Sequence, residues 1–235
     1  MTENGESLLP KLATAARLNI ISEAAAFISL LVAVLSLFLF AWIGDGVAHQ
    51  RTMGLDLAIR SQVHAYTSPG LTRAMIAISF IGGDGLAAAI VISLIAFRWL
   101  RWRRALLWMF VTILGALVLD LSLKYAFHRP RPVPFFTDLP RTYSFPSGHS
   151  LFSFCFYGVL AGLLTRRISS RIGRILIWTF AALLVAAIGL SRIYLGVHYP
   201  SDVIAGYLAA SLWVSTLVAL DRVRLQRKNA ADPEA

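Results

Sequence analysis

Six long apolar runs restrict the fold of this chain more than any other feature of its sequence. They cover about residues 24–43, 74–97, 105–123, 147–164, 172–190 and 202–220. A helix needs roughly 20 mostly apolar residues to cross the ~30 Å hydrocarbon core of a bilayer. Inside a bilayer, helices and closed barrels satisfy all their own backbone hydrogen bonds. We therefore predict an all-α integral membrane protein, a bundle of six transmembrane helices.

The composition agrees with a membrane protein and argues against other classes. Of the 235 residues, 57% are hydrophobic and only 14% are charged, whereas about a quarter of a soluble domain is charged. The net charge of +10 could indicate nucleic-acid binding, but the basic residues stand in short clusters beside the apolar runs, as topology signals do. We expect no nucleic-acid partner. Cys155, the single cysteine, lies in an apolar run and is expected to be a small core residue.

Basic clusters in alternate connections predict the orientation. They contain Lys11, Arg17, Arg98, Arg101, Arg103, Arg104, Arg166, Arg167, Arg171, Arg174, Arg222, Arg224, Arg227 and Lys228. The positive-inside rule then places both termini in the cytoplasm. The first apolar run is too long for a signal peptide and is expected to remain as a span. The expected parts are a cytoplasmic tail 1–17, a six-span domain 18–222 and a basic cytoplasmic tail 223–235, with connections 44–73, 124–146 and 191–201 facing outward across the cytoplasmic membrane.

The first outward connection and the second span each raise a question of role. Apolar residues at helical spacing from Leu55 to Tyr66 predict a short helix in the membrane interface, ended by a turn at Ser68-Pro69-Gly70. This helix is interpreted as a brace or lid. Asp84 is a carboxylate within the second span, where both a functional role and a structural hydrogen bond are open.

Polar groups collect at the outward ends of the last four spans. Lys124 and Arg131 lie in the second outward connection, and Pro146-Ser147-Gly148-His149 opens the fourth span. The third connection and the start of the sixth span carry the remaining groups, Arg192, His198 and Asp202. Because neighbouring spans of a bundle lie side by side, these groups can converge.

Their chemistry suits a tetrahedral anion. Helix N-termini carry free N–H groups and partial positive charge. Ser147 can cap its helix, and Gly148 lets a backbone N–H approach a ligand closely. Together with Lys124, Arg131 and Arg192 these helix ends would hold phosphate. His198 lies four residues before Asp202, so the carboxylate can orient one imidazole nitrogen and leave the other free to attack; His149 could supply the acid. Nothing in this pattern predicts a metal site.

Three tracts together carry a resemblance to a known family. Lys124-x6-Arg131-Pro132, Pro146-Ser147-Gly148-His149 and Ser191-Arg192-x5-His198-x3-Asp202 resemble the signature of the type 2 phosphatidic acid phosphatase family, whose membrane branch dephosphorylates lipid phosphates and polyprenyl diphosphates. The resemblance implies that His198 is the nucleophile and forms a phosphohistidine, that Asp202 orients it, and that His149 is the general acid and base. It further implies phosphate binding by Lys124, Arg131, Ser147, Gly148 and Arg192, without metal or cofactor.

Other residues are expected to support this site. Asp120 lies one helical turn before Lys124 and can pair with it, and Pro132 and Pro146 flank the motifs. The histidines His49, His64 and His128 are expected at the interface. Four aromatic residues could line an entrance for a lipid tail or form an interfacial belt: Phe135, Phe136, Tyr143 and Phe145.

The function expected from these observations is a metal-independent lipid phosphatase of the cytoplasmic membrane, with its active site on the extracytoplasmic side. The candidate substrates are undecaprenyl diphosphate, phosphatidylglycerophosphate, phosphatidic acid and a lipid A phosphate. A lipid-to-lipid phosphotransferase is the alternative enzyme. A non-enzymatic anion or lipid transporter would not need the two histidines. The sequence leaves the substrate and the oligomeric state open.

Overall fold

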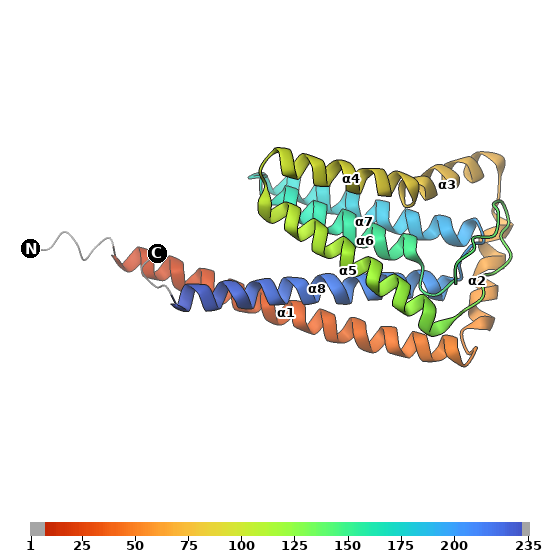
Figure 1. The fold of residues 1–235 in the computed structure, drawn as a ribbon, viewed down its shortest axis with the longest axis horizontal. Coiled ribbons are helices and arrows are strands. Elements are labelled where there is room, and N and C mark those ends of the chain that lie inside the picture. Colours follow the sequence, from red (N-terminus) through yellow and green to blue (C-terminus); the bar gives the residue numbers. More distant parts are fainter. Residues whose placement is uncertain (1–7, 232–235) are drawn as a thin grey trace, which may run out of the picture.

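A computed structural model describes residues 8–231, with side chains for residues 23–227. The regular elements of this described part are all α-helices (Figure 1). They are α1 (Leu8–Ala48), α2 (Met53–Ala65), α3 (Pro69–Ile81), α4 (Asp84–Trp99), α5 (Arg103–Phe127), α6 (Gly148–Thr165), α7 (Arg171–Tyr194) and α8 (Pro200–Ala231). The outer parts of the two predicted tails, residues 1–7 and 232–235, lie outside the described residues. The rest of both predicted tails continues α1 and α8.

Six stretches of the described chain are long and apolar enough to span a membrane, as predicted. They are Glu23–Ala48, Pro69–Trp99, Arg103–Phe127, Gly148–Thr165, Arg171–Tyr194 and Pro200–Arg227. The outer surface carries large apolar side chains, with Trp42 and Phe180 each 68% exposed. The bundle interior instead holds small residues such as Ala116, Ala205 and Ala210, all fully buried, which let helices approach closely in a membrane.

The bundle has two distinct ends (Figure 1). The start of α1 and the end of α8 lie at one end, where these two helices pack along each other and extend past the other helices. At the opposite end, α2 and the connections 128–147 and 195–199 close the bundle. We call this opposite end the α2 end. Because every predicted site residue lies near a helix end or in a connection at the α2 end, the fold brings them together there.

The second span differs from the prediction of one helix over 74–97. It consists of α3 and α4, separated by Gly82 and Gly83. Both glycines lie where a side chain would clash: a Cβ on Gly82 would be 2.3 Å from Ile188, and one on Gly83 would be 2.8 Å from Nε2 of His149. The break therefore allows the backbone to touch α6 and α7. Asp84 begins α4 with an exposed side chain, where a carboxylate is favourable for the helix dipole.

The predicted interfacial helix is present as α2, but its packing is unusual. The apolar residues Leu55 and Tyr66 are 67% and 76% exposed, whereas Asp56 and Arg60 are buried. The predicted turn at residues 68–70 is wrong, because Ser68 caps α3 by accepting a hydrogen bond from the backbone N–H of Leu71. The two buried charged residues, Asp56 and Arg60, are thus turned into the protein, whereas Leu55 faces outward.

Candidate active site

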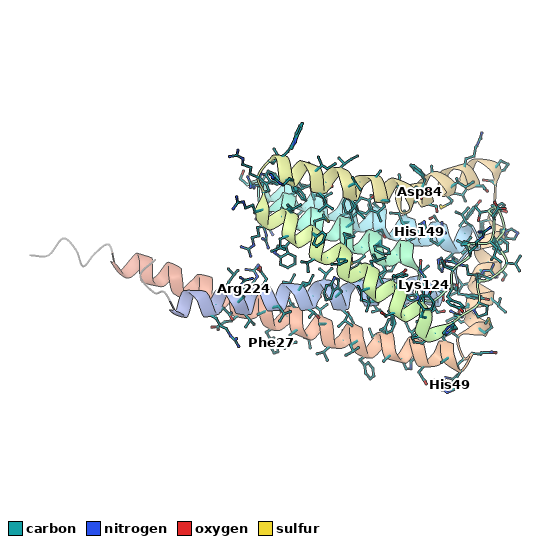
Figure 2. All side chains as sticks on the ribbon, in the orientation of Figure 1. Phe27, His49, Asp84, Lys124, His149 and Arg224 are labelled. Carbon is teal, nitrogen blue, oxygen red and sulfur yellow. The ribbon has the colours of Figure 1, made fainter. Side chains whose placement is uncertain are left out.

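A cavity of about 460 Å³ opens at the α2 end between α4, α5, α6 and α7. Its polar wall contains Lys124, Arg131, Gly148, His149, Arg192 and His198. Figure 2 shows Lys124 and His149 on neighbouring helices of the bundle. Its apolar wall contains Leu86, Ala87, Ile90 and Phe152. Residues that are far apart in the sequence therefore meet in one cavity, as the sequence predicts.

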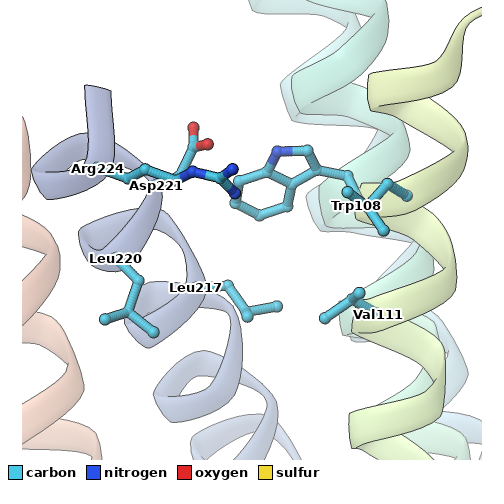
Figure 3. A pocket seen from close by; sticks show the side chains of 7 residues that line it. Trp108, Val111, Leu217, Leu220, Asp221 and Arg224 are labelled. Atoms are coloured by element: carbon cyan, nitrogen blue, oxygen red, sulfur yellow. The ribbon is translucent and has the colours of Figure 1, made fainter. Parts of the chain in front are cut away.

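A second hollow lies between α5 and α8, toward the end that holds the termini (Figure 3). It measures about 190 Å³ and is lined by Trp108, Val111 and Leu217 among others. Its acid, Asp221, is paired with Arg104 at 2.6 Å. None of the predicted site residues lines this second hollow. The groups suited to phosphate chemistry therefore line the cavity at the α2 end.

His198 lies in the connection between α7 and α8 with both ring nitrogens engaged. Its Nδ1 is 3.4 Å from Oδ2 of Asp202, and its Nε2 is 3.0 Å from Nη1 of Arg131. A guanidinium only donates hydrogen bonds, so Nε2 accepts and the ring proton lies on Nδ1, toward Asp202. In this tautomer Nε2, the nitrogen that faces the cavity, carries no proton, and its electron pair accepts the hydrogen bond from Arg131.

The surroundings of His198 keep its imidazole neutral. Burial, which is the largest cause, together with the positive charges of Arg131 and Arg192 lowers the pKa of His198 from 6.5 to about 4, although the hydrogen bond that His198 donates to Asp202 opposes this shift. A neutral imidazole at physiological pH is the form that can act as a nucleophile.

The three predicted cations are held by different partners. Lys124 donates to both carboxylate oxygens of Asp120 at 2.7 Å, which is the predicted pair. Arg131 donates to the backbone oxygen and the hydroxyl of Thr142, at 2.7 and 2.9 Å. Arg192 donates to the hydroxyl of Ser79 on α3. Only Lys124 is neutralised by a carboxylate here, so the cavity offers an anion two uncompensated guanidinium groups.

The start of α6 shapes the opposite wall. A Cβ on Gly148 would lie 3.1 Å from both Nζ of Lys124 and Oδ1 of Asp120, so a side chain at this position would crowd the Lys124–Asp120 pair. His149 follows it and lies against Gly83. The side chain of Ser147 is fully buried, caps α6 through the N–H of Ser150, and does not line the cavity. The structure therefore does not bring the Ser147 hydroxyl to the place predicted for phosphate.

The flanking prolines and the aromatic residues lie outside the cavity wall. Pro132 and Pro146 are buried behind it. Of the two roles left open for the four aromatic residues, a place in the cavity wall is not supported, because they do not line the cavity. Phe145 is in the core, Phe135 stacks on His64, Phe136 stacks on Tyr194, and Tyr143 packs against His128. The apolar part of the cavity wall is instead formed by residues of α4 and α6.

Three polar residues around Asp202 were not predicted from the sequence: Asp56, Arg129 and Ser144. Arg129 donates from Nη1 to Oδ1 of Asp202 at 2.5 Å and from Nη2 to Asp56 at 2.8 Å. Ser144 donates to Oδ2 of Asp202 at 2.5 Å. A signal for Asp56 was present in the sequence: Asp56 and Arg60 are opposite charges four residues apart, on one face of a short helix that also carries apolar residues. Arg129 and Ser144 had no such signal.

Comparisons with known proteins agree with this fold and site. The PAP2 superfamily model matches residues 105–225. The chain is 30% identical over 179 residues to phosphatidylglycerophosphatase B of Bacillus subtilis strain 168, covering 73% of this chain and 86% of that protein. It is 27% identical over 177 residues to undecaprenyl-diphosphatase of Sulfolobus acidocaldarius, covering 73% and 80%. The crystal structure of a transmembrane PAP2-type phosphatidylglycerolphosphate phosphatase from Bacillus subtilis superposes with a TM-score of 0.74 at 26% identity, covering 82% of this chain and 96% of that one.

The six-span bundle, with its cavity of cations and histidines, therefore defines a multi-pass membrane phosphatase. The chain belongs to the PAP2 superfamily. The predicted family, the helical membrane fold and the class of enzyme, a phosphoric ester hydrolase, are confirmed.

Proposed function

We propose that this protein hydrolyses the terminal phosphate of a lipid phosphate or diphosphate through a phosphohistidine on His198, without a metal ion. The observation that carries this proposal is the geometry of His198. One ring nitrogen is backed by the buried carboxylate of Asp202, and the other faces a cavity whose far wall holds His149. Binding alone would not need a neutral, oriented imidazole.

In the first step, Nε2 of His198 attacks phosphorus. A P–N bond forms while the P–O bond to the lipid breaks, and protonated His149 gives its proton to the leaving oxygen. In the second step His149 takes a proton from water, the water oxygen bonds to phosphorus, and the P–N bond breaks to release inorganic phosphate. Arg131, Arg192 and Lys124 stabilise the charge on the phosphoryl oxygens. The contact between Arg131 and Nε2 must give way when a phosphoryl group occupies this position.

The shape of the cavity supports a lipid leaving group. His149 lies against the backbone of Gly83, so the oxygen that it protonates would face α4. From there Leu86, Ala87 and Ile90 continue the cavity with apolar side chains. Phosphatidylglycerophosphate, undecaprenyl diphosphate, phosphatidic acid and a lipid A phosphate share this plan of a terminal phosphate on an apolar tail. The first two correspond to the names of relatives of this chain.

A phosphate-release assay on purified protein in detergent tests the proposal. The four candidate lipids would be compared with EDTA present, and we expect turnover of at least one of them at an undiminished rate. His198→Ala should lower turnover by about 1000-fold or more, because the nucleophile is lost. An absolute requirement for metal would contradict the mechanism. Transfer of the phosphoryl group to a second lipid, without release, would identify a phosphotransferase.

A further inference from the structure

A chain of buried charges connects α2 with the proposed nucleophile. Asp56 on α2 accepts from Arg129 at 2.8 Å, and Arg129 donates to Asp202 at 2.5 Å. The side chains of these three residues are only 3%, 6% and 0% exposed. Asp202 in turn faces Nδ1 of His198. Asp56 touches neither the cavity nor His198, so any effect on the reaction must pass through Arg129 and Asp202.

The two carboxylate oxygens of Asp202 have different hydrogen-bond partners. Oδ1 accepts from Arg129, whereas Oδ2 accepts from the hydroxyl of Ser144 at 2.5 Å and from the backbone N–H of Tyr199 at 2.9 Å, and faces His198. With Oδ1 held by a guanidinium, the carboxylate cannot rotate without losing a buried ion pair. Arg129 therefore determines that Oδ2, and not Oδ1, faces His198.

The net charge of Asp56, Arg129 and Asp202 can compensate the charge that His198 gains in phosphoryl transfer. Phosphorylation of Nε2, with the proton kept on Nδ1, gives the His198 ring a positive charge. Asp56, Arg129 and Asp202 together carry a net charge of −1, which compensates this charge in a buried setting. Without the Asp56 carboxylate, Arg129 would cancel Asp202, and the phosphorylated ring would face a neutral group.

Asp56 also fixes the beginning of α8. Its carboxylate accepts from the backbone N–H of Ser201 at 2.9 Å and from the Ser201 hydroxyl at 2.6 Å. One turn further along α2, Arg60 donates to the backbone oxygens of Val133 and Gly196, at 2.9 and 3.1 Å. The buried face of α2 thus holds both connections that carry Arg131 and His198. Buried ion pairs add little net stability compared with apolar packing, so stability alone does not explain this face.

We propose that Asp56 is a positioning residue for phosphoryl transfer, acting through Arg129 to aim Asp202 and to leave it the negative charge that phosphorylated His198 requires. This inference rests on the proposed role of His198 as nucleophile. It assigns α2, which contributes nothing to the cavity wall, to the catalytic machinery as the support of the aspartate that orients the nucleophile.

The test compares Asp56→Asn with a matched control, Asp45→Asn. We expect Asp56→Asn to lower kcat by about 10- to 100-fold, with KM within about twofold of wild type, because the groups proposed to hold phosphate are untouched. Asp45 pairs with Arg51 on the surface near α2 and is 51% exposed, so Asp45→Asn should keep wild-type kcat. A kcat for Asp56→Asn within twofold of wild type would overturn the proposal.

A double variant separates charge balance from simple loss of structure. Asp56→Asn combined with Arg129→Met removes the guanidinium that would otherwise cancel the charge of Asp202 and restores the net charge of −1, so its kcat should exceed that of Asp56→Asn. A merely structural role predicts a double variant at least as impaired as the single one, and that result would overturn the proposal.

Folding and the role of His198 are measured in parallel. Should Asp56→Asn not accumulate as folded protein, Asp56→Glu and the double variant replace it, and both should be folded and active. A folded double variant that is as inactive as His198→Ala would then contradict the proposal. Failure of the nucleophile assignment is recognised separately, because His198→Ala would then retain activity in the same assay.

Discussion

At the scale of single residues, the site depends on groups that are held in one protonation state or one position. Burial lowers the pKa of His198 and so favours its neutral form, and because Asp202 engages Nδ1, the unprotonated Nε2 faces the cavity and Arg131. Gly83 acts by what it lacks, since a Cβ there would occupy the space of the His149 ring. The neighbours of these residues determine the protonation state of His198 and the space available to the His149 ring.

The pH dependence of catalysis follows from the pKa of His198. Because burial lowers this pKa to about 4, about nine-tenths of the imidazole is still neutral at pH 5. We therefore expect kcat/KM to be maintained between pH 7 and 5 and to fall near pH 4. A pH profile of initial rates checks this, and an acid limb centred near pH 6.5 would contradict it.

The pH dependence of folding stability should also reflect the pKa of His198. The folded pKa of His198 lies below its ordinary value of 6.5, so the folded state disfavours protonation. Its contribution to stability is complete above pH 6.5 and is lost as the pH falls through 4. The Tm in detergent should decline over this range, and a His198→Gln variant should show a smaller decline.

At the scale of elements, the site depends on the junction of α6 and α8. The backbone N–H of Ser147, which caps α6, donates to the backbone oxygen of Asp202 at 2.9 Å. Gly206, one turn further along α8, packs directly on this cap. The helix that carries Gly148 and His149 is thus tied to the helix that carries Asp202, and small residues at the contact permit it.

Gly206→Ala should therefore damage both stability and activity. Its Cβ would lie 2.6 Å from the backbone oxygen of Ser147 and 2.9 Å from Cβ of Ser150, so the two helices must separate. Overpacking of this kind costs about 1–3 kcal/mol, and we expect a lower Tm and a kcat reduced by about tenfold or more. Gly158→Ala on α6 is the matched control, because nothing lies within 4 Å of its Cβ. Equal behaviour of the two variants would refute the argument.

At the scale of the whole molecule, the two ends of the bundle differ in how they use positive charge. At the α2 end, Arg60, Arg129, Arg131 and Arg192 donate to acceptors inside the protein. At the other end, the connections between spans carry dense basic clusters, such as Arg98 to Arg104. An even number of spans places both termini on one side, and the positive-inside rule predicts that this side is the cytoplasm.

A reporter fusion tests this orientation. A reporter fused after Asp221 should read cytoplasmic, and one inserted after Tyr66, between α2 and α3, should read extracytoplasmic. Accessibility of a cysteine introduced at Tyr66 to an impermeant thiol reagent in whole cells provides an independent measurement. The opposite pattern would place the active site on the cytoplasmic side.

Much of this protein was predictable because the relevant signals are local in the sequence. Hydropathy determined the six spans, and the spacing of Lys124, Arg131, His149, Arg192, His198 and Asp202 determined the identity of the cavity's polar residues. These signals need no knowledge of packing. They depend on how many apolar residues cross a bilayer and on which side of it each motif falls.

Tertiary structure alone decided which residues support the site. The break at Gly82–Gly83 is required by side chains of α6 and α7, and the apolar wall of the cavity comes from α4 rather than from the aromatic residues near the motifs. Asp56 meets Arg129 across 73 residues and Ser201 across 145 residues. No periodicity reports such a contact, because an ion pair between distant segments exists only after the helices have packed and excluded water from it.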